Sequence, residues 1–374
     1  MNLAGERARI ELIEPLRGLA ALAVAWYHLT VRGNILPEGS WIRATGEFGW
    51  LGVEVFFVIS GFIIPYSLWR GHFRIRKDLG IFLAKRIIRL DPPYLVAIVL
   101  LILLGSASAF IPGYAKSSPT ITVPQVLCHL GYLNAFLGYE WLSPVFWTLA
   151  IEFQYYVLVA LAFPLFASRI GTHRLVALAL LTLSGVLLDQ GQFVFRYGGL
   201  FSLGIVTFQK HLGLWSVRQY LGLLVTISFF TILTLGLLNG VVGTATALLI
   251  AFYNIRRNRT LALLGAMSYS LYLMHWPIGM LVIHSTAQFA TSDESRVAIL
   301  GAALAASFLS SYLLFRLIER PVQRWSSSIR YTGEMANTSR KLNPDEVLPV
   351  TLPSSSVVIP KLSDRTDTAT TARP

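Results

Sequence analysis

The sequence has 374 residues, of which 54% are hydrophobic and only 13% charged, whereas soluble domains carry about 25% charged residues. This composition excludes an ordinary soluble protein and predicts a polytopic membrane protein of all-α class. The formal net charge of +12 does not indicate a nucleic-acid partner here, because Lys and Arg collect in the cytoplasmic loops of membrane proteins. The single cysteine, Cys128, excludes an intramolecular disulfide and a cysteine-based metal cluster, and we expect no bound metal.

The apolar segments predict a membrane helical bundle of about ten spans with both termini in the cytoplasm. An even number of spans places both termini on one side. That side then holds most of the 31 Lys and Arg residues, in agreement with the positive-inside rule. We therefore expect a multi-pass protein of a cell membrane, such as the bacterial inner membrane. The predicted spans are 16–31, 50–69, 92–111, 146–167, 175–189, 195–209, 219–238, 241–254, 262–288 and 297–317.

The spans divide the chain into three regions. Residues 1–15 form a cytoplasmic N-terminal segment with no removable signal peptide, and residues 16–325 form the membrane domain. Residues 331–374, rich in Ser, Thr, Pro and mixed charge, predict a disordered cytoplasmic tail. The longest external connection is 112–145, and its segment Val126–Leu137 is apolar enough for a short interfacial or re-entrant helix.

The first span contains two ionisable residues, Arg17 and His28, with only apolar side chains and one glycine between them. Eleven residues make about three helical turns, so the two side chains share one face and lie roughly 16 Å apart along the axis. An ionisable group at membrane depth indicates a functional site, and histidine is the side chain best suited to moving protons near neutral pH. The alternative is a hydrogen-bonded histidine packed between helices, with an arginine that merely follows the positive-inside rule.

Two arginines, Arg86 and Arg89, precede the third predicted span on its cytoplasmic side. A spacing of three residues places them on one helix face, and paired arginines suit phosphate binding. The alternative is again a cytoplasmic cap of the span.

Two carboxylates are predicted near the outer ends of their spans. Glu152 lies about two turns into the fourth span, with Thr148 on the same face, and Glu54 opens the second span. Either carboxylate is a candidate to orient His28 and raise its basicity, as the third member of a catalytic triad does. The alternative for Glu152 is an interhelical salt bridge.

Other polar positions have more structural interpretations. The pair Ser60-Gly61 favours close helix packing. His275 lies mid-span near Tyr272, beside Pro277, which predicts a kink, so this histidine either contacts substrate or packs helices. Glu319 is expected to cap the last span at its cytoplasmic end.

Taken in order, these segments resemble the membrane acyltransferase-3 family, whose members acylate sugar hydroxyls of exported glycans, lipid-linked sugars or glycosides. The resemblance runs from Leu16 to about Trp325. Each motif alone is weak, and the order of six is the specific signal. The matching elements are R-x10-H at Arg17 and His28, the GVxxFFVxSGF pattern at Gly52 to Phe62, RxxR at Arg86 and Arg89, W-S/T-L-x-x-E at Trp147 to Glu152, SYxLYLxHxP at Ser268 to Pro277, and IExP at Ile318 to Pro321.

The resemblance implies an O-acyltransferase that uses acyl-CoA, most often acetyl-CoA, as co-substrate. It implies that His28 is the catalytic residue, acting as a general base on the sugar hydroxyl, and that the RxxR arginines bind the donor from the cytoplasm. Glu152 or Glu54 would orient the imidazole, and Arg17 would position His28 or contact the donor. The candidates for substrate contact or support are Glu54, Thr148, Tyr272 and His275.

A transporter or flippase of a lipid-linked saccharide, without acyl transfer, is the alternative function. Such a protein also needs polar residues at mid-membrane depth. The two halves of the sequence show no repeat, and the Walker A, GxSxG and HExxH motifs are absent from it. A saccharide, acyl-CoA and the lipid bilayer are the expected partners.

Overall fold

The computed structural model describes residues 3–107, 121–188, 191–254 and 258–332. Within these ranges the chain forms helices and connections but no strand, which confirms the all-α prediction. The predicted disorder of the tail concerns residues 333–374, which lie outside the described ranges.

Every predicted span falls on a helix where it is described. Short elements lie among the main helices of the described residues. They are the 3-10 turns Gly49–Leu51, Val194–Tyr197 and Ala287–Phe289, the π-helical segments His28–Arg32 and Phe315–Glu319, and the short helices α2 (Trp41–Gly46), α5 (Val123–Leu130) and α6 (Asn134–Leu137). The main helices are α1 (Leu3–Tyr27), α3 (Gly52–Arg70), α4 (Ile75–Ala107), α7 (Phe146–Phe166), α8 (Gly171–Leu187), α9 (Gly198–His211), α10 (Val217–Leu235), α11 (Leu237–Phe252), α12 (Arg259–Ala266), α13 (Ser268–Thr286), α14 (Asp293–Leu314) and α15 (Arg320–Ser328).

Among the described residues, five helices are long and apolar enough to cross a membrane, or six if the bent pair α12–α13 is one span. Helices α8 and α11 are apolar but shorter. Helix α1 is not among the five, because every 18-residue stretch of it includes Glu11, Glu14 and Arg17. The structure therefore supports a helical membrane protein, while the count of about ten spans and the side of the termini stay predictions.

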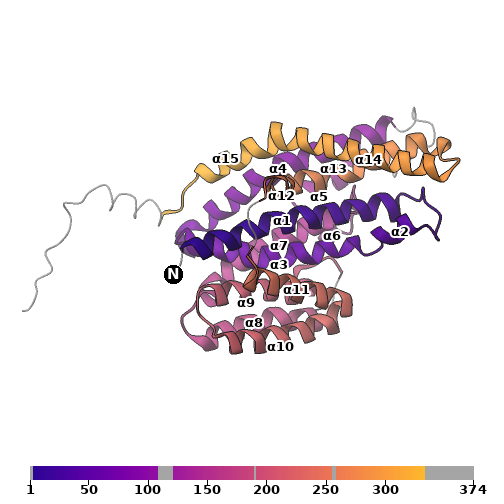
Figure 1. Ribbon diagram of the computed structural model, residues 1–374. Helices are drawn as coiled ribbons and strands as arrows, with labels where there is room; N and C mark the ends of the chain where they lie inside the picture. Colours follow the sequence, from indigo (N-terminus) through magenta and orange to yellow (C-terminus); the bar gives the residue numbers. More distant parts are fainter. Residues whose placement is uncertain (1–2, 108–120, 189–190, 255–257, 333–374) are drawn as a thin grey trace, which may run out of the picture. The chain divides into compact units, whose positions relative to one another are not determined.

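Helices α1 and α3 lie side by side at the centre of residues 3–332 (Figure 1). Helices α8 to α11 pack on one another, and α9 and α11 join this group to α3. Helix α13 packs on α1, α4 and α14, and α15 packs on α4. Helix α7 contacts both α3 and α4, so α1, α3, α4, α7 and α13 surround one interior.

The crossing of α3 and α9 requires glycine on both helices. A Cβ atom on Gly61 would collide with the carbonyl oxygen of Phe201, and one on Gly204 would collide with that of Val58. Small residues let membrane helices approach closely in this way. The packing interpretation is thus confirmed for Gly61, whereas the side chain of Ser60 lines the interior and donates to Glu152.

Helix α4 extends beyond its predicted span, and one predicted helix is wrong. Helix α4 begins at Ile75, so Arg86 and Arg89 lie on one helix before the predicted span 92–111. Pro92 and Pro93 lie inside it, and membrane helices tolerate proline where neighbouring groups satisfy the freed backbone atoms. The predicted helix 126–137 is instead the pair α5 and α6, broken where Tyr132 has a φ of 57°.

The kink expected at Pro277 stays a prediction. Pro277 lies within the continuous helix α13, and a sharp bend of 64° lies between α12 and α13. One further prediction fails near the end of the chain. Glu319 does not cap a span, because α14 continues through a π-helical segment into α15. Its side chain is buried and accepts hydrogen bonds from Ser270 N (3.1 Å), Ser270 Oγ (2.5 Å) and Gln323 Nε2 (2.7 Å), which ties the last helices to α13.

Candidate functional site

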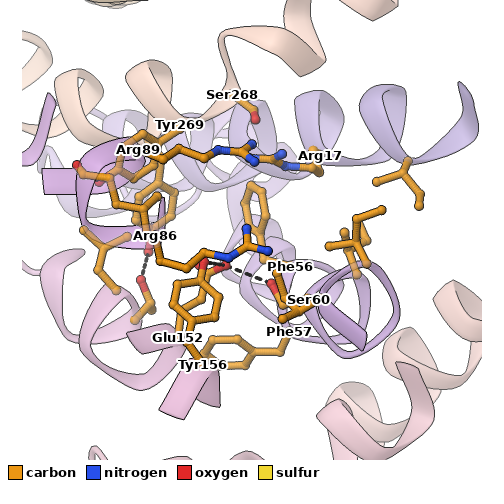
Figure 2. A pocket seen from close by; sticks show the side chains of 18 of the residues that line it. Arg17, Phe56, Phe57, Ser60, Arg86, Arg89, Glu152, Tyr156, Ser268 and Tyr269 are labelled. Atoms are coloured by element: carbon orange, nitrogen blue, oxygen red, sulfur yellow. Dashed lines mark hydrogen bonds between the residues drawn. The ribbon is translucent and has the colours of Figure 1, made fainter. Parts of the chain in front are cut away.

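The interior between α1, α3, α4, α7 and α13 holds a cavity of about 170 Å³, here called the arginine cavity. Arg17 enters it from α1 and Arg86 and Arg89 from α4, with Glu152 of α7 opposite (Figure 2). Three arginines face one carboxylate, so the cavity favours an anion. The apolar part of its wall comes mostly from α3, through Val53, Phe56, Phe57, Ile59, Ile63 and Ile64.

The three arginines of the arginine cavity differ in whether a hydrogen bond holds them in place. Arg86 donates from Nη2 to Ser67 Oγ (3.0 Å), and its guanidinium lies 5.1 Å from the ring centroid of Phe82 and 5.2 Å from that of Tyr156. Arg17 and Arg89, by contrast, form no hydrogen bond or ion pair with any residue in the described ranges. Their donors therefore remain available to a ligand, and arginine donors match phosphate and carboxylate oxygens.

Glu152 is fixed within this cavity. Its Oε1 accepts hydrogen bonds from Ser60 Oγ of α3 (2.9 Å) and from Tyr156 Oη (2.5 Å) (Figure 2). It also interacts electrostatically with Arg17 and Arg86. A fixed negative charge among three arginines keeps their positive charges together.

The arginine cavity adjoins a second cavity of about 550 Å³, here called the basic mouth, and shares Ile63, Ser67, Arg86 and Arg89 with it. The mouth adds Arg70 and Lys85, and Lys85 Nζ lies 4.7 Å from the ring centroid of Tyr331. Further walls come from α15 through Gln323, Ser326 and Ser327. The Arg86–Arg89 pair thus lies where two positively charged cavities meet.

A third cavity of about 470 Å³, the histidine cavity, contains His28 together with Glu54, Arg32, Arg196 and Asn239. Glu54 is buried, and its Oε2 has no hydrogen-bond partner in the described part of the chain. Aromatic rings make up much of the wall. They are Tyr27, Trp50, Trp147, Tyr197 and Tyr272.

His28 is the first residue of the π-helical segment that continues α1, an irregularity frequent at functional sites. It is 8% exposed, and its ring packs edge-on against Trp276 (centroids 5.3 Å apart). Its Nδ1 lies 3.0 Å from the carbonyl oxygen of Val24 and 3.1 Å from Nε2 of His275. Among the described residues nothing bonds to its Nε2.

Val53 and Tyr272 line both the arginine cavity and the histidine cavity, so they form a partition between them. The hydroxyl of Tyr272 lies 2.6 Å from Thr148 Oγ1 and donates to the carbonyl oxygen of Val145 (3.2 Å). Both side chains are buried. The three cavities are therefore neighbours in series, and the partition lies between the arginines and His28.

The predicted pairing of Glu152 with His28 is not found, because Glu152 bonds to Ser60 and Tyr156 in the other cavity. We assigned the two residues the same depth, but Thr148 already lies at the partition, and Glu152 is one turn, about 6 Å, beyond it. Glu54 shares the cavity of His28 but is not hydrogen-bonded to it. The ionisable side chain within hydrogen-bond distance of the His28 ring is instead that of His275.

Some site residues were missed in the sequence. Tyr156 follows Glu152 by four residues, a helical spacing that predicts contact. An ionisable group inside a membrane needs a partner, so the mid-span histidines could have been paired with each other. Ser60 and Glu152 are 92 positions apart, and no local pattern joins them.

This sequence is similar to a known protein family and to a curated viral protein. A model of the Acyl_transf_3 family, described as an acyltransferase domain, matches residues 11–316. A protein of Acidianus two-tailed virus named "Putative acetyltransferase ORF330" is 31% identical over 149 residues, which is 40% of this chain and 39% of the viral protein. The chain therefore matches about two fifths of that relative's length. No solved structure matches. The family match covers most of the chain and the lining of all three cavities, apart from Gln323, Ser326, Ser327 and Tyr331 of the basic mouth. The chain therefore belongs to the acyltransferase-3 family.

Proposed function

We propose that this protein transfers an acyl group, most simply acetyl, from cytoplasmic acyl-CoA to a hydroxyl of a saccharide. The observation that carries the proposal is the series of three cavities. An arginine-lined side suits a polyanionic donor, a histidine-lined side suits a hydroxyl acceptor, and Val53 and Tyr272 are the common wall.

The donor side fits the shape and charge of CoA. The nucleotide phosphates of CoA would bind at the basic mouth, where Arg70 and Lys85 stand beside Arg86 and Arg89. The pantetheine arm would extend into the arginine cavity, whose wall from α3 is apolar. This arrangement would bring the thioester to the partition. It agrees with the predicted cytoplasmic location of these arginines.

The acceptor side has the features of a saccharide site. Trp50, Trp147 and Tyr197 offer flat apolar faces of the kind that sugar rings stack against. Glu54 offers an unpaired carboxylate oxygen, and a buried acceptor of this kind costs free energy until a donor reaches it. A sugar hydroxyl next to the reacting one would supply that donor.

His28 acts as the general base in this proposal. Nε2 takes the proton of the sugar hydroxyl while the hydroxyl oxygen forms a bond to the thioester carbonyl carbon. The carbon–sulfur bond then breaks, and the leaving thiolate takes the proton from Nε2, which yields the ester and free CoA. A positioned base contributes roughly 10²–10⁴-fold in rate.

The test uses membranes of the source organism in which the gene is deleted and restored as wild type or His28→Ala. The membranes contain the native acceptor and receive [1-¹⁴C]acetyl-CoA. We expect label in the saccharide fraction with the wild-type protein and its loss, by at least roughly 10²-fold, with His28→Ala at equal protein level. Equal labelling by the two proteins would refute the proposal. Binding and movement of saccharide without any label transfer would favour the flippase.

A further inference from the structure

We propose that His275 is a positioning residue that holds His28 in the tautomer with Nδ1 protonated and Nε2 free to act as base. This inference rests on the proposed function and goes beyond it, since the sequence predicted a carboxylate, Glu152 or Glu54, in this role.

The tautomer of His275 follows from its own helix. Its Nδ1 lies 2.9 Å from the carbonyl oxygen of Leu271. A carbonyl oxygen can only accept, so Nδ1 of His275 carries a proton. In the neutral imidazole the other nitrogen, Nε2, is then an acceptor. His275 is fully buried, which favours the neutral ring because an isolated charge is costly away from water.

The tautomer of His28 follows in turn. Its Nδ1 lies 3.1 Å from Nε2 of His275 and 3.0 Å from the carbonyl oxygen of Val24. Both of these neighbours are acceptors, so Nδ1 of His28 is the donor. The lone pair of His28 is therefore on Nε2, the nitrogen without a partner among the described residues.

The roles of the two histidines are not interchangeable. Both ring nitrogens of His275 are engaged, one by Leu271 and one by His28, and His275 lines none of the three cavities described above. His28 lines the histidine cavity. When His28 becomes an imidazolium during transfer, its Nδ1–H keeps the same two acceptors. His275 thus does for His28 what the buried carboxylate does in a serine-protease triad, where loss of the correct tautomer is costly.

The experiment compares two variants that each keep half of the His275 contacts. The amide oxygen of a glutamine reaches the position of Nε2, so His275→Gln preserves an acceptor for His28. The amide nitrogen of an asparagine reaches the position of Nδ1, so His275→Asn preserves the bond to Leu271 but removes that acceptor. A third variant, His275→Met, fills a similar volume without either nitrogen.

Label transfer from [1-¹⁴C]acetyl-CoA is measured in the same membranes over a range of donor concentrations. We expect kcat to fall about 10²-fold for His275→Asn and His275→Met, with KM for acetyl-CoA unchanged, and we expect His275→Gln to recover most of the loss. If His275→Asn is produced too poorly to measure, the comparison of His275→Met with His275→Gln takes its place. Equal kcat values for the acceptor-retaining and acceptor-lacking variants would overturn the inference.

A double variant separates positioning from a structural role. In a His28→Gln background the base is already absent, so adding His275→Asn should leave the residual rate unchanged. A further fall would mean that His275 acts through the fold. Failure of the proposed function would look different, since wild-type membranes themselves would then transfer no label.

Discussion

The arginine cavity and the histidine cavity share two wall residues but differ in how their polar groups are held. In the arginine cavity, Glu152 is fixed by Ser60 and Tyr156, and Arg86 is fixed by Ser67. In the histidine cavity, Glu54 has an oxygen with no partner in the described ranges, and His28 is held on one side of its ring only. The first cavity thus holds its carboxylate and one of its three arginines in place, and the second leaves the free side of His28 and one oxygen of Glu54 to the substrate.

This difference matches the demands of the two substrates in the proposed reaction. A CoA donor is always the same polyanion, so a cluster of arginines around a fixed carboxylate suits it. The acceptor must give up a proton at the moment of transfer, which requires a nitrogen that is free in the resting enzyme. In the proposed reaction, Val53 and Tyr272 separate the donor side from the acceptor side.

The largest effect on the donor side should come from removing the arginine pair. Arg86→Ala with Arg89→Ala removes two charge-assisted contacts to phosphate, each worth about 1.5–3 kcal/mol. We expect KM for acetyl-CoA to rise by at least about 10²-fold, measured by label transfer over a range of donor concentrations. Retention of transfer at saturating donor would separate this effect from loss of the fold.

The matched control is Arg296→Ala. Arg296 is half-buried on α14, pairs with Asp293 at 2.7 Å and lies outside all three cavities. The Arg296→Ala variant should leave KM for acetyl-CoA unchanged. If the pair and the control behave alike, Arg86 and Arg89 only follow the positive-inside rule, and the donor binds elsewhere.

Removing the ring of Tyr272 from the partition should increase hydrolysis of the thioester relative to acyl transfer. Tyr272→Ala removes the ring that separates the cavities, so water from the histidine cavity would reach the donor. We expect the ratio of acetyl-CoA hydrolysis to saccharide transfer to rise about tenfold, equivalent to ~1.4 kcal/mol in relative barrier height. Free CoA and labelled saccharide are measured in parallel.

Tyr272→Phe is the control for this experiment. It keeps the ring but removes the hydroxyl that contacts Thr148 and Val145. If the bulk of the ring forms the partition, Tyr272→Phe should resemble the wild type in the hydrolysis ratio. Equal leakage in both variants would indicate that the hydrogen bond to α7, rather than the ring, keeps the cavities apart.

Much of this site could be predicted from local sequence. The apolar content and the charge distribution indicated a helical membrane protein, and intramembrane ionisable residues indicated Arg17, His28, Glu54 and Glu152, each of which lines a cavity. These predictions follow from one principle, the free-energy cost of placing a charged side chain in hydrocarbon.

Which of these residues face one another could not be predicted. His28 and His275 are 247 positions apart, and their contact depends on how α1 and α13 pack. Glu152 was therefore placed beside His28, when it lies on the far side of Tyr272.

The smallest effect should come from the unpaired carboxylate in the histidine cavity. Glu54→Gln keeps the size of the side chain but replaces one acceptor oxygen by a donor, so a sugar hydroxyl loses a hydrogen bond worth about 1 kcal/mol. We expect the acceptor KM to rise about fivefold and KM for acetyl-CoA to stay constant, measured with a fixed donor and graded amounts of saccharide extract. Glu47→Gln, at an exposed position outside the cavities, serves as the control. A change in donor KM instead would mean that Glu54 acts across the partition, and that the two cavities are one site with a shared electrostatic field rather than two sites with separate tasks.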